Sequence, residues 1–509
     1  MRTTTRGVLA ALTLPPLLAG CFAASGPDSA AGQGSGADGA KRLRVALAVP
    51  PVQALSPYSN DATVLSKLSV AEGLTALGAD GTAKAALATS WKRADATTWT
   101  FELRKASFQD GTEVTPAAVV NALDHAGAAK TRPRVLSDVT LTAKAEGAST
   151  VRITTGVADP VLPLRLASPA LGILAAGAYA KDGSVDPAGN GTGPFEITKL
   201  TGTSKATLRR FDGYWGGQAK APGIDVSWIA DGTARANALR AGDVDIAEWI
   251  PTSQAKLLDA KTRHEVPSVR TDSLVLNTAS GVFTDAPLRA AAREAVDGPA
   301  LVGSVFGGYA DAPKGLFGPG IPWAAGDRTA VTGRAGAASA TEVRSATKGK
   351  TLRLATYTNR SELPEAATVL QQQLEKAGFT VKQDVREYTQ MEADLLAGKY
   401  DALVFSRVTL LDTGDAVSYL ASDFTSKGVY NIAGLKDPAV DRAIAAAAEE
   451  GDTERRRQKT MAAEAAVLRT DAVVPLVHEK VVQGIATGVE GVLLDPRERS
   501  LIDADTRLR

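Results

Sequence analysis

The sequence predicts an α/β protein with mixed sheets. Segments with strand-like alternation of apolar and polar residues are followed repeatedly by segments with helical periodicity. Several of the helical segments begin at an N-cap residue and end at a glycine. The chain has 509 residues, of which 44% are hydrophobic. This length exceeds one typical hydrophobic core, so we expect two or three subdomains.

The N-terminal segment has the pattern of a secretory signal. Two arginines precede an apolar run of small residues from Val8 to Gly20, which is too short to cross a bilayer as a helix. We expect residues 1–20 to be a signal peptide. Residues 21–40 are mainly Gly, Ala, Ser and Asp and predict a flexible linker.

Cys21 is the only cysteine of the chain and ends the sequence Leu18-Ala19-Gly20-Cys21. This sequence resembles the bacterial lipobox, in which the cysteine is acylated and the signal is removed in front of it. The resemblance implies a protein attached by lipid to the extracytoplasmic face of the cell membrane. The alternative is an ordinary cleaved signal with an incidental cysteine.

The first half of the body, which starts at Lys41, contains clear strand and helix signals. Alternating apolar residues predict strands over 43–49 and 99–104. Thr115 followed by Pro116 is typical of a helix start, and the helix is expected to reach about Ala129. Thr233 is expected to cap a short helix that ends at Gly242, before a strand over 244–250.

The second half continues the alternation. Apolar residues on one face predict a helix over 362–377, with Gly378 as its stop and a strand over 379–385 behind it. Asp437-Pro438 predicts the start of another helix. A further helix from about Thr453 leads into an expected strand over 473–477.

Charge and composition narrow the classes of function. Lys and Arg number 57 against 56 Asp and Glu, so we expect no large basic field and no nucleic-acid partner. After the linker, no run reaches the ~18 apolar residues that a membrane helix needs.

The three histidines, His125, His264 and His478, are isolated in the sequence, and each is predicted to be at the surface or partly buried. We find no metal-ligand spacing and no basis for a Ser-His-Asp triad. The sequence therefore predicts no catalytic residues, no metal and no cofactor. A glycosidase-like carboxylate pair stays open, because its spacing is set only in space.

Long-range motifs carry a family resemblance. They occur in order along nearly the whole body: Ala71-Glu-Gly-Leu-Thr75, Asp80-Gly-Thr82, Ser90-Trp91, Trp99-Thr-Phe-Glu-Leu-Arg104, Phe108-Gln-Asp-Gly-Thr112, Gly191-Thr-Gly-Pro-Phe195, Tyr214-Trp-Gly-Gly217 and Ala241-Gly-Asp-Val-Asp245. This set resembles the family 5 extracellular solute-binding proteins, the peptide- and nickel-binding receptors of ABC importers. Gly73, Gly81 and Gly111 within it are expected at turns with positive φ.

The resemblance implies a two-lobe fold of the type II periplasmic-binding-protein kind, with an extra subdomain. Lobe I would comprise 41–71, 189–276 and 481–509, and 72–188 would form the subdomain upon it. Lobe II would comprise 277–480. Chain crossings near 274–278 and 478–482 would form a hinge, and the lobes would close around the ligand.

The resemblance also suggests residues that bind the ligand. Asp412 stands eight residues before the Leu of Tyr419-Leu420, the relation in which oligopeptide-binding members place the aspartate that pairs with the ligand's ammonium. The alternative is that Asp412 or Asp415 caps the next helix. Arg407 is expected to bind a carboxylate or to be solvated. Further predicted lining residues are Asn431, Tyr357, Tyr388 and Tyr419.

The resulting functional hypothesis is a lipid-anchored receptor, with no enzymatic activity, that captures a peptide or similar small solute and delivers it to an ABC permease. We expect a monomer. Within the same class, the alternative ligand is nickel held by an organic chelator. An anchored peptide hydrolase is the alternative from another class, and a sensor without a permease is a third.

Overall fold

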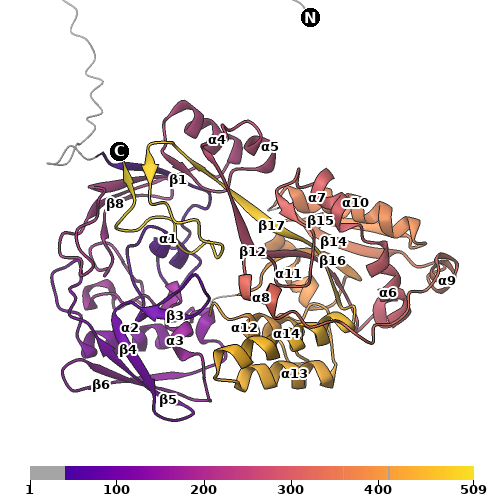
Figure 1. The fold of residues 1–509 in the computed structure, drawn as a ribbon, viewed down its shortest axis with the longest axis horizontal. Helices are drawn as coiled ribbons and strands as arrows, with labels where there is room; N and C mark the ends of the chain where they lie inside the picture. The colour runs from indigo at the N-terminus through magenta and orange to yellow at the C-terminus, as the bar shows by residue number, and fades with distance from the viewer. Residues whose placement is uncertain (1–40, 359, 411–412) are drawn as a thin grey trace, which may run out of the picture. The chain divides into compact units, whose positions relative to one another are not determined.

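The computed structural model describes residues 41–358, 360–410 and 413–509 (Figure 1). The predicted signal peptide, Cys21 and the linker lie outside these residues, as does Asp412. Within the described ranges, no helix is long and apolar enough to cross a membrane.

One large sheet of mixed orientation runs through the described residues (Figure 1). Its strands, in spatial order, are β15 (Val381–Arg386), β14 (Leu352–Tyr357), β16 (Ala402–Val408), β12 (Arg263–Leu276), β17 (Val473–Ile485), β11 (Ile246–Ala247), β1 (Leu43–Leu47), β10 (Gly223–Trp228), β9 (Lys205–Arg210) and β8 (Phe195–Thr201). The short strand β13 (Ala310–Asp311) pairs with β17 beside this path. The mixed α/β class predicted from the sequence is confirmed.

Two long strands connect the halves of this sheet. β12 pairs with β16 near its C-terminal end and with β17 along most of its length, and β17 also pairs with β11. The register between β12 and β17 shifts between Pro267 and Thr271 and again between Asp272 and Ser273. β12 and β17 are therefore the long strands that the two halves of the sheet share. Their pairing is irregular in the stretch of β12 from Pro267 to Ser273, where the chain passes from one half to the other.

Separate hydrophobic cores lie on the two sides of this irregular stretch of β12 and β17. One core contains only residues between Val269 and Val477. Its helices are α6 (Ala286–Ala295), α7 (Gly298–Ser304), α8 (Pro322–Gly326), α9 (Ala340–Ala346), α10 (Glu362–Lys376), α11 (Tyr388–Leu396), α12 (Ala416–Phe424), α13 (Pro438–Glu449) and α14 (Thr453–Arg469). We call it the 269–477 core.

The other half holds a core formed by β1, β8 to β10 and the chain end near Ile502, which we call the 43–502 core. The helices α1 (Ala62–Lys67), α4 (Gly232–Ala241) and α5 (Thr252–Ala255) and the ribbon of β18 (Val489–Glu490) with β19 (Arg507–Leu508) belong to this half. A smaller cluster around Leu239 and Val482 joins α4 to β17.

A third core lies between Leu74 and Ala175, and we call it the 74–175 core. It contains the antiparallel sheet β4 (Ala88–Arg93), β5 (Thr98–Leu103), β7 (Thr150–Thr155) and β6 (Leu141–Glu146), with the helices α2 (Pro116–Ala128) and α3 (Leu162–Arg165). A hairpin of β2 (Thr75–Leu77) and β3 (Ala83–Ala85) extends from it. Short 3-10 turns occur at 134–136, 169–171, 176–178 and 282–284.

Most elements expected from the sequence are present. Thr115 caps α2 by accepting a hydrogen bond from the Ala118 N–H. In α10 the buried side chains Leu363, Ala366, Leu370 and Leu374 share one face, as the helical periodicity predicted. The helices beginning at Pro438 and Thr453 are capped by Asp437 and Asp452.

Some local predictions were wrong. The cap of α4 is Asp231, whose carboxylate accepts from the Ala234 N–H, and Thr233 lies inside the helix. The strand expected over 244–250 shrinks to Ile246–Ala247, whereas β17 extends far beyond residue 477 to Ile485. A short apolar run in the sequence does not indicate how many of its residues will pair with a neighbouring strand. The ends of a strand therefore depend on tertiary pairing.

Two residue environments also differ from expectation. His478 was predicted at the surface or partly buried, but it lies on β17 opposite Thr271 of β12 and is only 1% exposed. Gly81 and Gly111 have positive φ, whereas Gly73 does not. Gly73 is required for another reason, since a Cβ there would lie 2.4 Å from the Leu166 carbonyl oxygen.

Candidate functional site

The topology of the large sheet singles out the end of β14. β14 pairs in parallel with β15 on one side and with β16 on the other. The chain runs from β14 through α10 to β15, and then through α11 across β14 to β16. The direction of the connections therefore reverses at β14. In open α/β sheets, ligands bind beyond the carboxyl ends of the strands at such a switch point.

The carboxyl ends of the parallel strands β14 and β16 lie at one edge of the sheet, which we call the β14–β16 edge. Arg360, just beyond β14, is held among carboxylates at this edge. Its Nε lies 2.7 Å from Glu362 Oε1, and its Nη2 donates to Glu479 Oε2. Glu479 belongs to β17, and its other oxygen accepts from the Ser406 hydroxyl on β16. Burial alone would lower the pKa of Arg360, but the charges of Glu479 and Glu362 raise it well above its usual value. The guanidinium therefore stays charged beside these carboxylates.

A second carboxyl group, that of Asp272 on β12, lies beside Glu479. Asp272 is 1% exposed, and among the described residues neither of its oxygens has a hydrogen-bond partner of ordinary geometry. Burial and the charge of Glu479 raise the pKa of Asp272 well above its usual value. Burial also acts against ionisation of Glu479, but the charges of Arg360 and Arg270 and the bond from the Ser406 hydroxyl act together in the opposite direction, and the pKa of Glu479 is lowered to about 2. Burial and the neighbouring charge therefore favour the protonated form of Asp272, whereas the ionised form of Glu479 is favoured.

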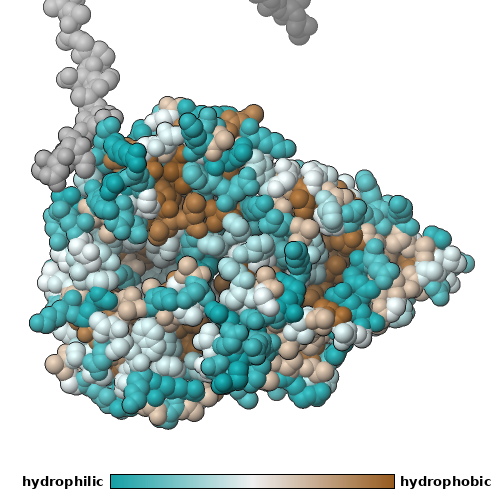
Figure 2. Space-filling view, in the orientation of Figure 1, coloured by the Kyte–Doolittle hydropathy of each residue, from teal (hydrophilic) through white to brown (hydrophobic). Residues whose placement is uncertain are grey.

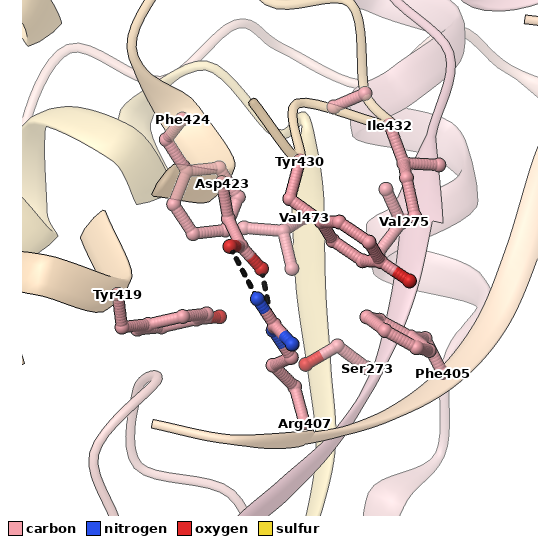
Figure 3. Close-up of a pocket in the computed structure, with 11 residues that line it drawn as sticks. Ser273, Val275, Phe405, Arg407, Tyr419, Asp423, Phe424, Tyr430, Ile432 and Val473 are labelled. Atoms are coloured by element: carbon pink, nitrogen blue, oxygen red, sulfur yellow. Dashed lines mark hydrogen bonds and ion pairs between the residues drawn. The ribbon is translucent and has the colours of Figure 1, made fainter. Parts of the chain in front are cut away.

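Arg407, near the end of β16, lies at the centre of a small pocket (Figure 3). Its Nε and Nη2 donate to the two carboxylate oxygens of Asp423 on α12, at 2.7 and 2.8 Å. Its guanidinium carbon lies 4.6 Å from the ring centre of Tyr430. Burial raises the pKa of Asp423, and Arg407 acts in the opposite direction. The ion pair with Arg407 therefore opposes the effect of burial on the Asp423 carboxyl group, although burial remains the larger influence on its pKa.

The pocket around Arg407 is mostly apolar and small. Its volume is about 20 Å³, which suits a single water molecule. The residues that line it are Ser273, Val275, Phe405, Arg407, Tyr419, Asp423, Phe424, Tyr430, Ile432, Ala433 and Val473. Tyr419 and Tyr430 lie on opposite sides of the guanidinium in Figure 3. Two of the predicted residues, Arg407 and Tyr419, thus meet here.

Tyrosines cluster on the same side of the sheet. Tyr357 accepts a hydrogen bond from the Ser406 N–H at 3.2 Å and lies edge-on to Tyr388, with ring centres 5.2 Å apart. Tyr388 and Tyr430 both donate to Glu392 Oε1, at 3.2 and 3.1 Å. Burial raises the pKa of Tyr430 to about 12, so these hydroxyls act as hydrogen-bond donors at neutral pH.

The remaining predicted residues have different surroundings. The Asn431 side chain donates to the carbonyls of Thr425 and Leu435 and accepts from the Leu435 N–H, so it holds the loop after α12. Asp415 is the N-cap residue of α12, but its carboxylate binds Arg456 rather than the helix amides. Ligand binding by Asp412, and by the other predicted residues, stays a prediction.

Sequence reasoning missed four charged residues of this edge: Asp272, Arg360, Asp423 and Glu479. Asp272 shares a strand face with Leu274 and Leu276, both 0% exposed. A charged residue in the apolar alternation of a strand was the available signal. For Glu479, the partners are Arg360 and Ser406, over 70 residues away in sequence, and local patterns carry no information on such pairs.

A second groove lies away from this edge, at the end of β17, with a volume of about 440 Å³. It contains none of the predicted residues and is lined by Lys261, His264, Ile485, Ala486, Thr487, Val489, Gly491, Val492 and Leu494. The face in Figure 2 is mostly polar, with apolar residues gathered below α4. In the part of the chain that the structure describes, no group of three or more His, Cys, Asp or Glu side chains could hold a metal ion.

Comparison with known families decides the class of this fold. Residues 82–431 match the model of bacterial extracellular solute-binding proteins, family 5. The chain belongs to the family 5 bacterial extracellular solute-binding proteins. It is therefore a solute-binding protein of the kind that serves ABC importers, and this family consists of binding proteins rather than enzymes.

Individual relatives match this family 5 protein in sequence or in structure over most of its length. The glutathione-binding protein GsiB of Escherichia coli K12 is 28% identical over 464 residues, which is 87% of this chain and 90% of the relative. The structure of NikA from Brucella suis in complex with Fe(III)-EDTA has a TM-score of 0.77 at 21% identity, covering 92% of this chain and all of that one. The structure of DppA from Helicobacter pylori in complex with the peptide STSA gives 0.71 at 19% identity, covering 92% and 98%. The two-lobe periplasmic-binding-protein fold is thereby confirmed.

Proposed function

We propose that this protein is the lipid-anchored receptor of an ABC importer for a peptide or a similar small solute. The observation that carries the proposal is the edge at β14 and β16, where two guanidinium groups, buried carboxylates and tyrosine hydroxyls converge at the switch point of a family 5 fold. A peptide offers an ammonium, a carboxylate and amides, which such a mixed edge can complement. The name of the Escherichia coli relative supports this class, since glutathione is a tripeptide.

Ligand capture requires the halves of the molecule to move. The pocket at Arg407 has room for about one water molecule, whereas small-molecule sites usually measure several hundred Å³. We propose that lobe I (41–71, 189–276 and 481–509), with the subdomain 72–188, opens away from lobe II (277–480). The shared strands β12 and β17 would be the hinge, because their pairing is irregular between Pro267 and Ser273 of β12.

We assign roles to the charged residues on the same basis. Asp412 is proposed to bind the ligand's ammonium, because an enclosed cation without a partner is strongly unfavourable. Arg407 is proposed to shape the pocket around it, since Asp423 already occupies the Nε and Nη2 edge of its guanidinium. We propose that the pocket around Arg407 is supported by four further residues, Asn431, Tyr357, Tyr388 and Tyr419.

Calorimetric titration of the purified protein tests the ligand class. The panel is reduced glutathione, trialanine, N-acetyl-trialanine and the nickel complex of L-histidine. We expect a free-amine peptide to bind and to be recovered intact by mass spectrometry. Tighter binding of the nickel complex would favour the chelate alternative, and recovery of cleaved peptide would favour the hydrolase.

The variant Asp412→Ala tests the proposed contact. It should weaken binding of the free-amine peptide by at least about tenfold, which is the order of one charge-assisted hydrogen bond, and spare the N-acetylated peptide. Asp415→Ala is the matched control, because its carboxylate is engaged by Arg456. Equal losses for both peptides in Asp412→Ala would show that Asp412 serves the fold.

Anchoring is tested separately by metabolic labelling with a palmitate analogue. The parent chain should incorporate the label and fractionate with membranes, whereas Cys21→Ser should do neither. Equal labelling of both would contradict the lipid anchor. Delivery to a permease predicts that solute uptake by cells depends on the anchored protein, and a sensor would leave uptake unchanged.

A further inference from the structure

The tip of the β2–β3 hairpin touches elements of all three cores. The hairpin begins beside Leu74 of the 74–175 core, and its turn spans residues 78–82. Two arginines from distant parts of the chain donate to consecutive carbonyls of this turn. Arg497 Nη2 lies 2.8 Å from the Gly78 oxygen and 2.7 Å from the Ala79 oxygen, and Arg457 Nη2 lies 2.8 Å from the Asp80 oxygen.

The two arginines belong to different halves of the molecule. Arg497 precedes Leu501 and Ile502, which lie in the 43–502 core, and its side chain is 9% exposed. Arg457 lies on α14, whose residues Met461 and Val467 lie in the 269–477 core. Separation of the halves would therefore break the Arg457 contact and leave the Arg497 contacts in place.

Further contacts with the 269–477 half surround the same turn. Arg457 stacks over the ring of Trp323 at 5.5 Å, and the position of a Cβ on Gly81 lies 3.6 Å from Trp323 Nε1. Gly414 approaches Leu77 so closely that a Cβ would be 2.7 Å from its methyl carbon. The turn thus fits against α8 and α14 by shape as well as by the hydrogen bond.

The turn is built to keep its shape when the contact is released. Asp80 Oδ1 accepts from the Thr82 N–H and hydroxyl at 3.0 and 2.8 Å, and Oδ2 binds Lys84 Nζ at 2.7 Å. Gly81 supplies the positive φ that the turn needs. Its carbonyls therefore stay oriented without help from either arginine, as a preformed docking feature requires.

We propose that the tip of the β2–β3 hairpin is an interlobe latch. Arg457 is its positioning residue: its side chain donates to the Asp80 carbonyl when the lobes close, and this hydrogen bond breaks when they open. A latch made only in the closed state slows ligand release and leaves association nearly unchanged. This role in release rests on the proposed binding function, whereas the contact itself does not.

Hydrogen-exchange mass spectrometry of the full chain without added solute tests the contact. Arg457→Ala should speed exchange of amides in residues 76–84 by about tenfold, the order expected for loss of one hydrogen bond to a charged donor. Arg457→Lys should recover part of the protection. Arg455→Ala is the matched control on the same helix, because Arg455 is paired with Glu450. Unchanged exchange in Arg457→Ala, or equal changes in Arg455→Ala, would overturn the latch.

A second variant checks that the effect is specific to opening. Arg497→Ala removes contacts within one half and leaves the turn and Arg457 in place, so adding Arg457→Ala to it should speed exchange by about the same tenfold as in the parent chain. Loss of the Arg457→Ala effect in the Arg497→Ala background would mean that Arg457 acts only through Arg497, contrary to a preformed latch.

Stopped-flow release of reduced glutathione or trialanine, whichever binds in the titration, tests the functional role. Arg457→Ala should release the solute about tenfold faster, with the association rate changed less than about twofold. Unchanged release would overturn the role of the latch in retention. If neither peptide binds, the proposed peptide function fails, and the exchange experiment still decides the latch.

Discussion

The buried histidine His478 leads to a prediction for acid stability. Its Nε2 accepts from the Lys314 N–H at 3.1 Å, and its Nδ1 lies 2.9 Å from the Thr271 hydroxyl oxygen. That hydroxyl donates its proton to the Leu316 carbonyl at 2.7 Å, so Nδ1 must carry the ring proton. Protonation of Nε2 would abolish the bond to Lys314, and the neutral ring is the form that fits.

The size of the effect follows from the pKa. Burial, with the nearby charge of Arg328, lowers the pKa of His478 from 6.5 to about 4. Below pH 6.5 the unfolded chain therefore binds a proton that the folded chain does not. The stabilisation is fully present above pH 6.5 and is lost as the pH falls towards 4. With ~1.4 kcal/mol for each pH unit, the loss approaches about 3 kcal/mol.

Urea unfolding at a series of pH values measures this. Between pH 7 and 4, the free energy of unfolding of the parent chain should fall about 3 kcal/mol further than that of His478→Gln, which cannot titrate. Thr271→Val is the control, because it removes the hydroxyl contact and keeps the ring. It should lose about 1–2 kcal/mol at every pH and retain the parent slope. Equal slopes in the parent chain and His478→Gln would refute the reasoning.

Three further predictions concern other buried groups. Arg407→Ala should destabilise the protein by about 3–5 kcal/mol in urea unfolding, because it leaves the Asp423 carboxylate buried without its partner; recovery in a double variant with Asp423→Leu would confirm this cause, and no recovery would contradict it. Burial raises the pKa of Glu72 to about 7, so its contribution to stability is full below pH 4.5 and is lost as the pH rises through 7. Melting temperatures should fall over that window in the parent chain and less in Glu72→Gln, and parallel curves would count against the assignment. Leu370→Ala should cost about 2–5 kcal/mol, since Leu370 is 0% exposed in α10, whereas the exposed Thr368→Ala on the same helix should change unfolding by less than about 0.5 kcal/mol.

The candidate site was only partly accessible from the sequence. Arg407 and Tyr419 were predicted as lining residues, and the structure brings them into one pocket. Asn431 was predicted beside them, but its amide is occupied by the loop after α12. Short-range motifs can mark a segment near the site, whereas the direction of each side chain depends on neighbours from other elements.

The amino-acid sequence alone determined the α/β class, most helix starts and the family, because caps, periodicity and ordered motifs are local or linear properties. It also contained the signal and lipobox pattern, which lies outside the described residues. Tertiary structure alone decided the extents of β11 and β17, the burial of His478 and the opposite pKa shifts of Asp272 and Glu479. Asp272 and Glu479 lie on strands that pair across about 200 residues of chain, and their desolvation depends on that packing.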